Sequence, residues 1–340
     1  MFDWLFKKNK NDEYVSCEWL EYGVNFGAIG IHHCCQFSHS DKNDKPVSSL
    51  NSKNQYCIRE FFKQKNKVRK QHKKGKINER CIGCFDLKKQ VWEDKNKITR
   101  MAIGPNTKCN ASCIYCYTSY KKDFYNSKKD IPILYILKNF VENNFIDKEC
   151  EITFNNGEPL IMDEFEDIVN LFVDNNVGKL RVHSSGIKYS TAVRRALESG
   201  RCDFIVSPDS GNKELYKKIK RIDAFDKVVE NIKEYAKIQP TQANVQLKYI
   251  IIPTVNDTFD ALKEFIDIAK ECGVYRILLD IELWWYRKNS KNNTRIRKIF
   301  ELAKQAKCYM EERGIVLLPS IIFDEASSSH KDIYDEVMMN

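Results

Sequence analysis

The chain has 340 residues, and with 42% of them apolar it is long enough to bury a sizeable core, which excludes global disorder. The net charge of +9 is moderate but unevenly placed. No segment has the roughly 18 uninterrupted apolar residues of a membrane span, and residues 1–10 lack the apolar core of a secretion signal, so we expect a cytoplasmic protein.

Residues 1–95 are predicted to form a small cysteine-rich module, because regular periodicity is weak there and cysteines are frequent. Thirteen cysteines in so large a chain favour metal binding over disulfides. Four thiolates can hold an auxiliary iron–sulfur cluster, with a structural zinc ion as the alternative. The predicted ligands are Cys17, one of Cys34 and Cys35, Cys81 and Cys84.

The remaining cysteines are predicted to be buried small hydrophobes, namely Cys57, Cys150, Cys202, Cys272 and Cys308. Cys57 is also a weak catalytic candidate, as a spare ligand or hydrogen-atom donor. A basic run lies between Phe62 and Lys76, with eight lysines and arginines and no acidic residue. It could meet RNA, a phosphorylated sugar or an acidic peptide, or be a solvated basic helix.

From Lys97 onward, short apolar strands alternate with amphipathic helices, which predicts an α/β fold with parallel strands. Six strands are expected near residues 99–103, 151–154, 180–183, 204–207, 245–252 and 276–281. Helices are expected near residues 131–144, 163–174, 191–198, 224–237 and 259–271. These elements predict a partial (β/α)6 barrel over residues 96–290, with its active site at the carboxyl ends of the strands. Residues 291–340 would add a helix and a strand as a C-terminal extension.

The most informative motif is Cys109-Asn110-Ala111-Ser112-Cys113-Ile114-Tyr115-Cys116. Three thiolates leave one iron of a 4Fe–4S cluster open for an exogenous ligand. The Cys-x3-Cys-x2-Cys spacing, with Tyr115 before the last cysteine, resembles the signature of the radical S-adenosylmethionine (radical SAM) superfamily. The resemblance implies that the open iron binds SAM, which is reductively cleaved to a 5′-deoxyadenosyl radical that abstracts hydrogen from a substrate.

Later segments resemble further motifs of the family. Asn156-Gly157-Glu158-Pro159 is similar to its Gly-Gly-Glu-Pro element, with Asn156 in place of the first glycine. Strand-end residues Ser184, Ser207, Asp209 and Asn256 match positions that in the family surround the cofactor, although turn chemistry explains the same residue types. The cofactor-binding residues implied by the resemblance are Tyr115, Asn156, Gly157, Glu158, Pro159, Ser184, Ser207, Asp209 and Asn256.

The stretch from Gly27 to Cys35 resembles the hairpin of SPASM or twitch auxiliary-cluster modules, here on the N-terminal side of the barrel. Such relatives act mostly on peptides or proteins, which makes a peptide substrate the first expectation and a sugar or other small molecule, in a dehydrogenase or epimerase, the second. Asp280 and Glu282 are weak catalytic candidates beside three aromatic residues, Trp284, Trp285 and Tyr286.

The resemblance also implies an electron donor such as flavodoxin or ferredoxin, and a nucleic-acid partner is not expected. A third hypothesis, from a different class, is a non-catalytic iron–sulfur or RNA-binding protein on the same scaffold.

Overall fold

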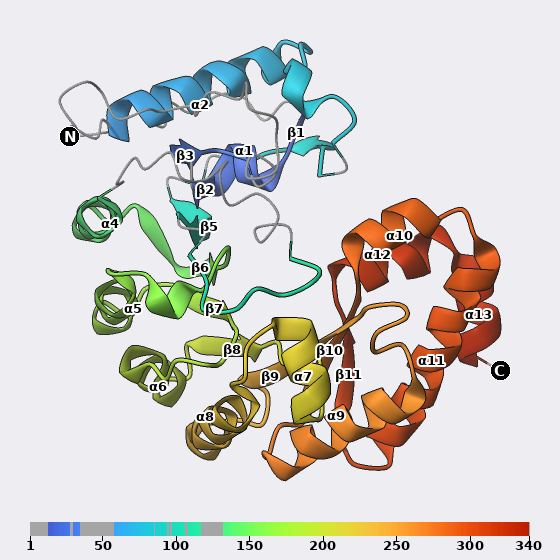
Figure 1. The fold of residues 1–340 in the computed structure, drawn as a ribbon. Helices are drawn as coiled ribbons and strands as arrows, with labels where there is room; N and C mark the ends of the chain where they lie inside the picture. Colours follow the sequence, from blue (N-terminus) through green and yellow to red (C-terminus); the bar gives the residue numbers. More distant parts are fainter. Residues whose placement is uncertain are drawn as a thin grey trace. The chain divides into compact units, whose positions relative to one another are not determined.

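The computed structural model describes residues 13–27, 30–34, 58–84, 86–93, 95, 97–105, 108–116 and 132–339 (Figure 1). Predicted sites at Cys35 and Cys57 lie outside these residues. The chain divides into two compact units. Unit 1 comprises residues 1–108 and 122–181, and unit 2 comprises residues 109–121 and 182–340.

Unit 1 is built on three parallel strands. The strand β5 (Ile98–Gly104) pairs in parallel with β2 (Gly23–Gly27) on one side and with β6 (Ile146–Phe154) on the other, while β3 (Gly30–His32) adds to β2 antiparallel. A separate antiparallel pair joins β1 (Glu13–Ser16) to β4 (Lys88–Val91). The N-terminal strand β2 is therefore part of the same sheet as β5.

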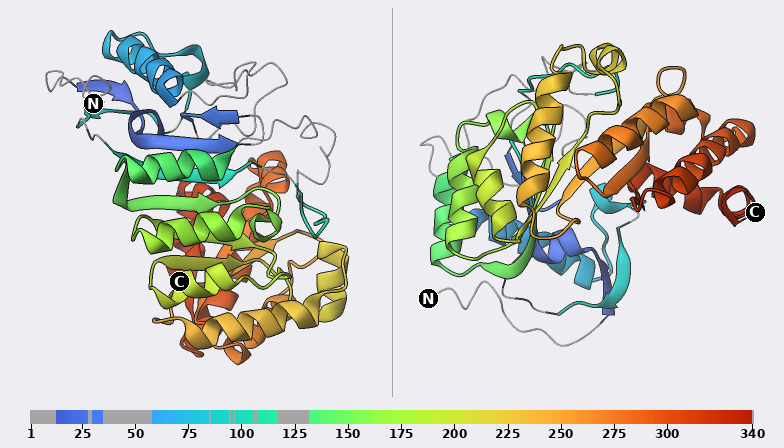
Figure 2. Two further views of the ribbon diagram at one scale, coloured as in Figure 1. Left: turned by 90° about the vertical axis from the view of Figure 1, so that its left-hand side faces the viewer. Right: turned by 90° about the horizontal axis from the view of Figure 1, so that it is seen from below.

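The described part of unit 1 has four α-helices and two short 3₁₀ helices. They are α1 (Glu18–Tyr22), α2 (Ile58–Lys73), α4 (Ile133–Glu142) and α5 (Phe165–Asp174), with the short 3₁₀ helices η3 (Glu79–Cys81) and η4 (Pro159–Ile161). In α4, Ile133, Ile136, Leu137 and Phe140 recur at helical spacing and are buried. Figure 2 shows α4 and α5 side by side, and in Figure 1 the helix α2 runs across α1 and β2.

Unit 2 continues with parallel strands whose order is β8 (Cys202–Val206), β9 (Val245–Ile251), β10 (Arg276–Ile281) and β11 (Val316–Pro319). The boundary between the units falls within β7 (Lys179–Ser184). Both Ile251 and Ile277 are fully buried, as expected for parallel strands covered on both faces.

The helices of unit 2 begin at side-chain caps that satisfy their first amides. Ser190, Asn212 and Thr258 cap α6 (Thr191–Glu198), α7 (Lys213–Lys220) and α9 (Phe259–Glu271). The others are α8 (Phe225–Ile238), α10 (Leu283–Asn289), α11 (Asn293–Glu311), α12 (Ile321–Ser329) and α13 (Lys331–Met339). Helices α10 to α13 gather at the C-terminal end (Figure 2).

The predicted α/β class with parallel strands is confirmed, and each of the six predicted strands is present within a few residues of its expected bounds. The prediction that Cys308 is buried is wrong, because it is exposed on α11, away from the buried stripe that contains Ala303, Ala306 and Met310. Cys150, Cys202 and Cys272 are buried as expected. The three-part domain division stays a prediction. Among the described residues, no helix is long and apolar enough to cross a membrane.

Candidate cofactor site

The cysteine motif forms a loop, residues 109–116, which we call the cluster loop. A turn closes its second half, where the Cys116 amide donates to the Cys113 carbonyl over 3.1 Å. The Ala111 amide donates to the Cys109 thiol over 3.4 Å. All three cysteines of the loop are free thiols.

The cluster loop is held by the C-terminal end of α7. The amide of Ser112 donates to the Lys220 carbonyl, and the amide of Ile114 donates to the Ile219 carbonyl, both over 3.0 Å. The last carbonyls of a helix have no partner inside it. Here the loop supplies those partners, while Arg221 ends the helix in the left-handed region at φ 55°.

A buried ion pair lies beside the same loop. The Lys220 ammonium contacts the Asp209 carboxylate and also donates to the Tyr115 hydroxyl over 2.9 Å. The Tyr115 hydroxyl in turn donates to Asp209 over 2.5 Å. Both ionic side chains are essentially inaccessible to solvent, at 3% for Lys220 and 0% for Asp209. Two charges at this depth persist only because each has its partner.

The pKa shifts follow from this arrangement. Burial lowers the pKa of Lys220, but Asp209, Cys113 and Tyr216 together raise it by more, so the pKa is raised overall. Burial, and then Asp209, raise the pKa of Tyr115. Burial also raises the pKa of the Cys113 thiol, which the Lys220 charge opposes. Lys220 is therefore a permanent positive charge close to a predicted cluster ligand.

The strand-end residues of unit 2 are largely engaged within the chain. Asp209 also accepts the Ile250 amide over 2.8 Å, and Asn256 bridges the Ile252 amide and the carbonyls of Asp209 and Ile250. Both side chains are fully buried. Ser184 accepts the Gly186 amide over 2.9 Å, whereas Ser207 is half-buried. The neighbouring Ser185 donates to Asn110 of the cluster loop over 3.0 Å, a link that the sequence did not indicate.

The Asn-Gly-Glu-Pro element lies in unit 1, directly after β6. Asn156 and Gly157 both have positive φ, 62° and 57°. Asparagine is one of the few residues other than glycine that adopts this region readily, which explains how it replaces a glycine. Glu158 is buried and caps η4 by accepting the Leu160 amide, and its own amide donates to the Lys108 carbonyl over 2.8 Å. Pro159 begins η4.

The described N-terminal cysteines, Cys17, Cys34, Cys81 and Cys84, all belong to unit 1, and their role as cluster ligands stays a prediction. Burial raises the pKa of the Cys17 thiol to about 12, against the Leu20 amide, which lowers it, and Cys34, Cys81 and Cys84 add to the rise. Burial likewise raises the pKa of Cys81 to about 11, with Cys34 and Cys84 contributing. The thiol of Cys17 therefore interacts electrostatically with those of Cys34, Cys81 and Cys84. Cys17 caps α1 through its sulfur, 3.4 Å from the Leu20 nitrogen.

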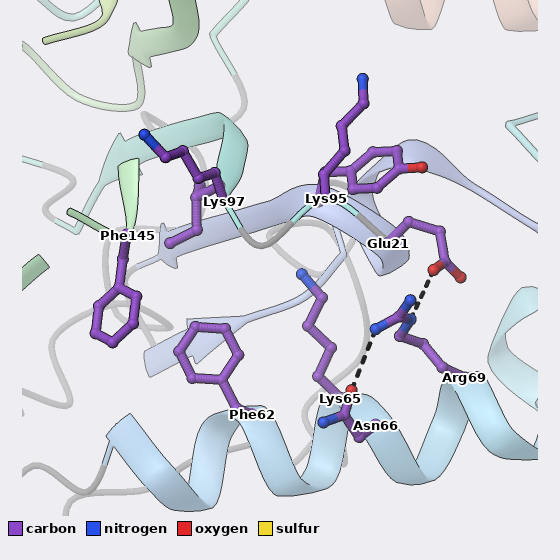
Figure 3. A pocket seen from close by; sticks show the side chains of 10 residues that line it. Glu21, Phe62, Lys65, Asn66, Arg69, Lys95, Lys97 and Phe145 are labelled. Carbon is purple, nitrogen blue, oxygen red and sulfur yellow. Dashed lines mark hydrogen bonds and ion pairs between the residues drawn. The ribbon is translucent and has the colours of Figure 1, made fainter. Parts of the chain in front are cut away.

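A second buried lysine lies near this four-cysteine set. The Lys65 side chain extends from α2 toward β2 (Figure 3). Its ammonium donates to the Gly23 carbonyl over 2.8 Å. Burial lowers its pKa to about 7, with Arg69 lowering it further and Glu21 and Cys17 opposing. Its neighbour Arg69 is paired with Glu21 over 2.6 Å. These side chains line a small pocket that Lys95 and Lys97 make strongly basic.

The weak catalytic candidates have structural partners. Asp280 is buried, forms an ion pair with Lys248 over 2.7 Å, and accepts the amides of Ile322 and Phe323 at the start of α12. Glu282 caps α10 by accepting the amides of Trp284 and Trp285. Of the nearby aromatic residues, Tyr286 is buried, whereas the Trp284 side chain is 54% exposed and free to contact a ligand.

The donor sets fit iron–sulfur clusters by their chemistry. No group of three or more His, Cys, Asp or Glu in the described part of the chain is placed as the ligands of a single metal ion. A cubane cluster separates its cysteine sulfurs more widely than one ion does. Three free thiols on one short, anchored loop, and four neighbouring thiols in unit 1, are the ligand types such clusters take.

Comparison with known proteins defines the class of domain. Residues 103–267, just under half of the chain, match the Radical SAM superfamily, a family that implies a 4Fe–4S cluster and SAM as cofactors. The match begins in β5 and includes the cluster loop.

Relatives by sequence include GTP 3′,8-cyclases. The chain is 27% identical over 177 residues to a probable GTP 3′,8-cyclase of Sulfurisphaera tokodaii, and 25% identical over 182 residues to the GTP 3′,8-cyclase of Clostridium perfringens. Each alignment covers 52% of this chain and 53% of the relative, so the chain matches about half the length of these proteins. Together with the superfamily match, they indicate an enzyme, against the non-catalytic hypothesis.

Similar folds occur in crystal structures of SuiB from Streptococcus suis. The structure bound to the precursor peptide SuiA has a TM-score of 0.54 at 14% identity and covers 88% of this chain and 62% of that chain. The structure bound to S-adenosylmethionine has a TM-score of 0.52, also at 14% identity, over 86% and 58%. These likenesses show the fold. They confirm neither a SPASM or twitch module nor a second cluster.

Proposed function

We propose that the protein is a radical SAM enzyme in which Cys109, Cys113 and Cys116 hold a 4Fe–4S cluster whose open iron binds SAM. The observation that carries the proposal is the anchored loop of three free thiols inside the matched domain. When bound, the cluster and SAM supply a 5′-deoxyadenosyl radical able to abstract hydrogen from an unactivated carbon.

The chain's own residues fix the geometry of that loop. Lys220 and Asp209 both form hydrogen bonds with the Tyr115 hydroxyl, which we call the clamp. The last carbonyls of α7 accept the amides of Ser112 and Ile114. Because Tyr115 lies between two cysteines of the motif, this clamp orients two of the three thiols. Asp209 then acts as a positioning residue, and Ser207 stays the more accessible candidate for hydrogen bonding to the cofactor.

The experiment is an assay of 5′-deoxyadenosine formation by the anaerobically reconstituted chain with dithionite as reductant. Wild type should cleave SAM, and a variant with Cys109, Cys113 and Cys116 all replaced by alanine should not. Equal cleavage by both proteins would overturn the proposal.

We further propose that Cys17, Cys34, Cys81 and Cys84 hold a second 4Fe–4S cluster, with zinc as the alternative occupant. The mutual interactions of the four thiols support the site, and the buried Lys65 beside Cys17 would offset part of the charge of the thiolates. Iron and sulfide counting on the triple alanine variant tests it. About four irons should remain. Zinc in their place would support the alternative.

For the substrate, we propose a peptide or protein side chain, with a small molecule as the second candidate. A fold like that of SuiB, solved with its precursor peptide, supports the first. The GTP 3′,8-cyclase relatives support the second. A peptide pool of random sequence, GTP and UDP-glucose, each added to the SAM cleavage assay, separate the two. Stimulation by GTP or UDP-glucose but not by peptide would overturn the peptide proposal.

A further inference from the structure

The proposed SAM cleavage assigns no role to the basic pocket beside Lys65. All of its lining residues belong to unit 1, and its lysines and its arginine come from α2 and from the segment that joins β4 to β5 (Figure 3). The space between the lining side chains, including the part open to solvent, is about 360 Å³. A space of this size accommodates one small molecule.

Positive charge is in excess in this pocket. Glu21 is the one carboxylate among the described residues that line it, and it forms an ion pair with the Arg69 guanidinium over 2.6 Å, so the two charges neutralise each other. Lys65, Lys95 and Lys97 add three amino groups. None of the three forms an ion pair with a carboxylate in the described part of the chain. The pocket is therefore suited to an anion.

Lys65 is a buried amino group with hydrogen-bonding capacity that the chain does not use. It is only 4% exposed. An ammonium group has three N–H donors, and the described residues offer it one acceptor, the Gly23 carbonyl at 2.8 Å. A buried charge without its full set of acceptors is unfavourable, and burial accordingly lowers the pKa of Lys65 to about 7, with Arg69 lowering it further. The oxygens of an anion in the pocket would supply the missing acceptors.

Lys95 and Lys97 line the same pocket and have only neutral partners. The Lys95 ammonium lies 5.1 Å from the centre of the Tyr22 ring. The Lys97 ammonium donates to the side-chain carbonyl of Asn144 over 3.1 Å at an exposed position. An anion displaces such contacts at little cost, because hydrogen bonds between charged groups are about twice as strong as those between neutral ones. Lysine also suits this task, since its ammonium is a point charge on a flexible stem.

We propose that this pocket binds the phosphate group of a small molecule, held by the ammonium groups of Lys65, Lys95 and Lys97. A phosphate monoester carries a charge of about −1.5 to −2 at pH 7 and has three acceptor oxygens, so it satisfies several cations at once, whereas a carboxylate brings a single charge. Phe62 and Phe145, whose ring centres are 6.2 Å apart, add an apolar wall for the body that carries the phosphate. An enclosed pocket favours a small molecule over RNA, whose backbone needs an open basic surface.

The experiment is isothermal titration calorimetry of the full, anaerobically reconstituted chain with inorganic phosphate, glucose 6-phosphate and acetate as probes. The pocket variant carries Lys95→Gln and Lys97→Gln. The control carries Lys88→Gln and Lys89→Gln, two exposed lysines of β4 that do not line the pocket, so the net charge changes equally. A third variant, Lys65→Met, removes the buried amino group. Circular dichroism checks that each variant folds, and metal analysis checks that its metal content equals that of wild type.

We expect the pocket variant to bind inorganic phosphate and glucose 6-phosphate about tenfold more weakly than wild type, and the control to bind them equally well. Lys65→Met should weaken binding as well. Tighter binding of glucose 6-phosphate supports an organic phosphate as the ligand, and tighter binding of inorganic phosphate supports the free ion.

Four results overturn the proposal: no phosphate binding by wild type, equal weakening in both double variants, unchanged binding by folded Lys65→Met, or acetate bound as tightly as phosphate. So does a 20-nucleotide RNA that binds wild type but not the pocket variant, when the small phosphates bind neither. Because these measurements do not involve SAM cleavage, such a result would leave the proposed function standing.

Discussion

Two candidate cysteine sites in this chain each lie beside a buried lysine, and the two lysines have different hydrogen-bond partners. Next to the cluster loop, Lys220 is paired with the Asp209 carboxylate, which raises its pKa. Next to the four-cysteine set, Lys65 has a backbone carbonyl as its hydrogen-bond acceptor, and burial lowers its pKa to about 7. The charge of Lys220 is neutralised by a carboxylate inside the protein, whereas burial disfavours the charged form of Lys65.

The largest expected effect, on SAM cleavage, tests whether the cluster loop rather than the four-cysteine set is the catalytic site. Cys113→Ala removes one of three ligands from a site that has no spare one on its loop, so SAM cleavage should fall below detection. Cys308→Ala, at an exposed thiol on α11, is the control and should keep wild-type activity. Deoxyadenosine formation measures both. Normal turnover by the Cys113 variant would remove the distinction between the two sites.

The second expected effect, on the free energy of unfolding, tests the buried ion pair of Lys220 with Asp209. Lys220→Met leaves the Asp209 carboxylate buried without its cation, which should cost about 3–5 kcal/mol of unfolding free energy. Adding Asp209→Asn should restore part of this loss, because the double variant buries no net charge. Urea unfolding of the metal-free, reduced protein measures it. Lys217→Met, one turn earlier on the exposed face of α7, should cost little. A loss no larger than that of the control would argue against the buried pair.

The third expected effect, on the pH dependence of stability, tests Lys65, whose hydrogen-bond acceptor is a backbone carbonyl. The pKa of Lys65 is lowered from 10.5 to about 7 on folding, so between these values the unfolded chain binds more protons. The contribution of Lys65 to stability therefore rises with pH from about 7 to 10.5, and its burial cost is largest below pH 7. Lys65→Met should be most stabilising, relative to wild type, at low pH. Unfolding of both proteins at pH 6, 8 and 10 would reveal it; a constant difference would contradict the lowered pKa.

The smallest effect separates the structural role of Cys17 from its role as a ligand. Its sulfur caps α1, and a hydroxyl serves the same purpose. Cys17→Ser should unfold within a few tenths of a kcal/mol of wild type in the metal-free state, whereas Cys17→Ala should lose about 1 kcal/mol. Both variants should lose iron from the four-cysteine set while keeping that of the cluster loop. Full iron content in the serine variant would exclude Cys17 as a ligand.

Local patterns in the sequence were sufficient to predict the strands, and they also point to both sets of cysteines, whose role as ligands stays a prediction. The three cysteines of the loop lie within eight consecutive residues, and the strands of the region that matches the radical SAM family have short apolar runs that stand out. The N-terminal strands were missed, because β2 and β3 are brief and buried throughout, without alternation. Such runs take their structure from the neighbour they pair with, here β5.

The buried lysines were missed for a related reason. Tyr115 and Lys220 are 105 residues apart, and no local pattern joins them. One signal was available, since Tyr216, Ile219 and Lys220 occupy the buried face of α7, where a lysine is out of place on an apolar stripe. A charged residue at a core position of an amphipathic helix needs an oppositely charged partner elsewhere in the chain, and for Lys220 that partner is Asp209.

The anchoring of the cluster loop to α7 makes the two a single cooperative unit. Since the amides of Ser112 and Ile114 complete the last turn of that helix, unwinding the turn releases the loop as well. Their hydrogen–deuterium exchange should then proceed at the same rate as that of the final α7 amides. A molecule that steadies this helix from outside would thereby also slow the opening of the metal-binding segment.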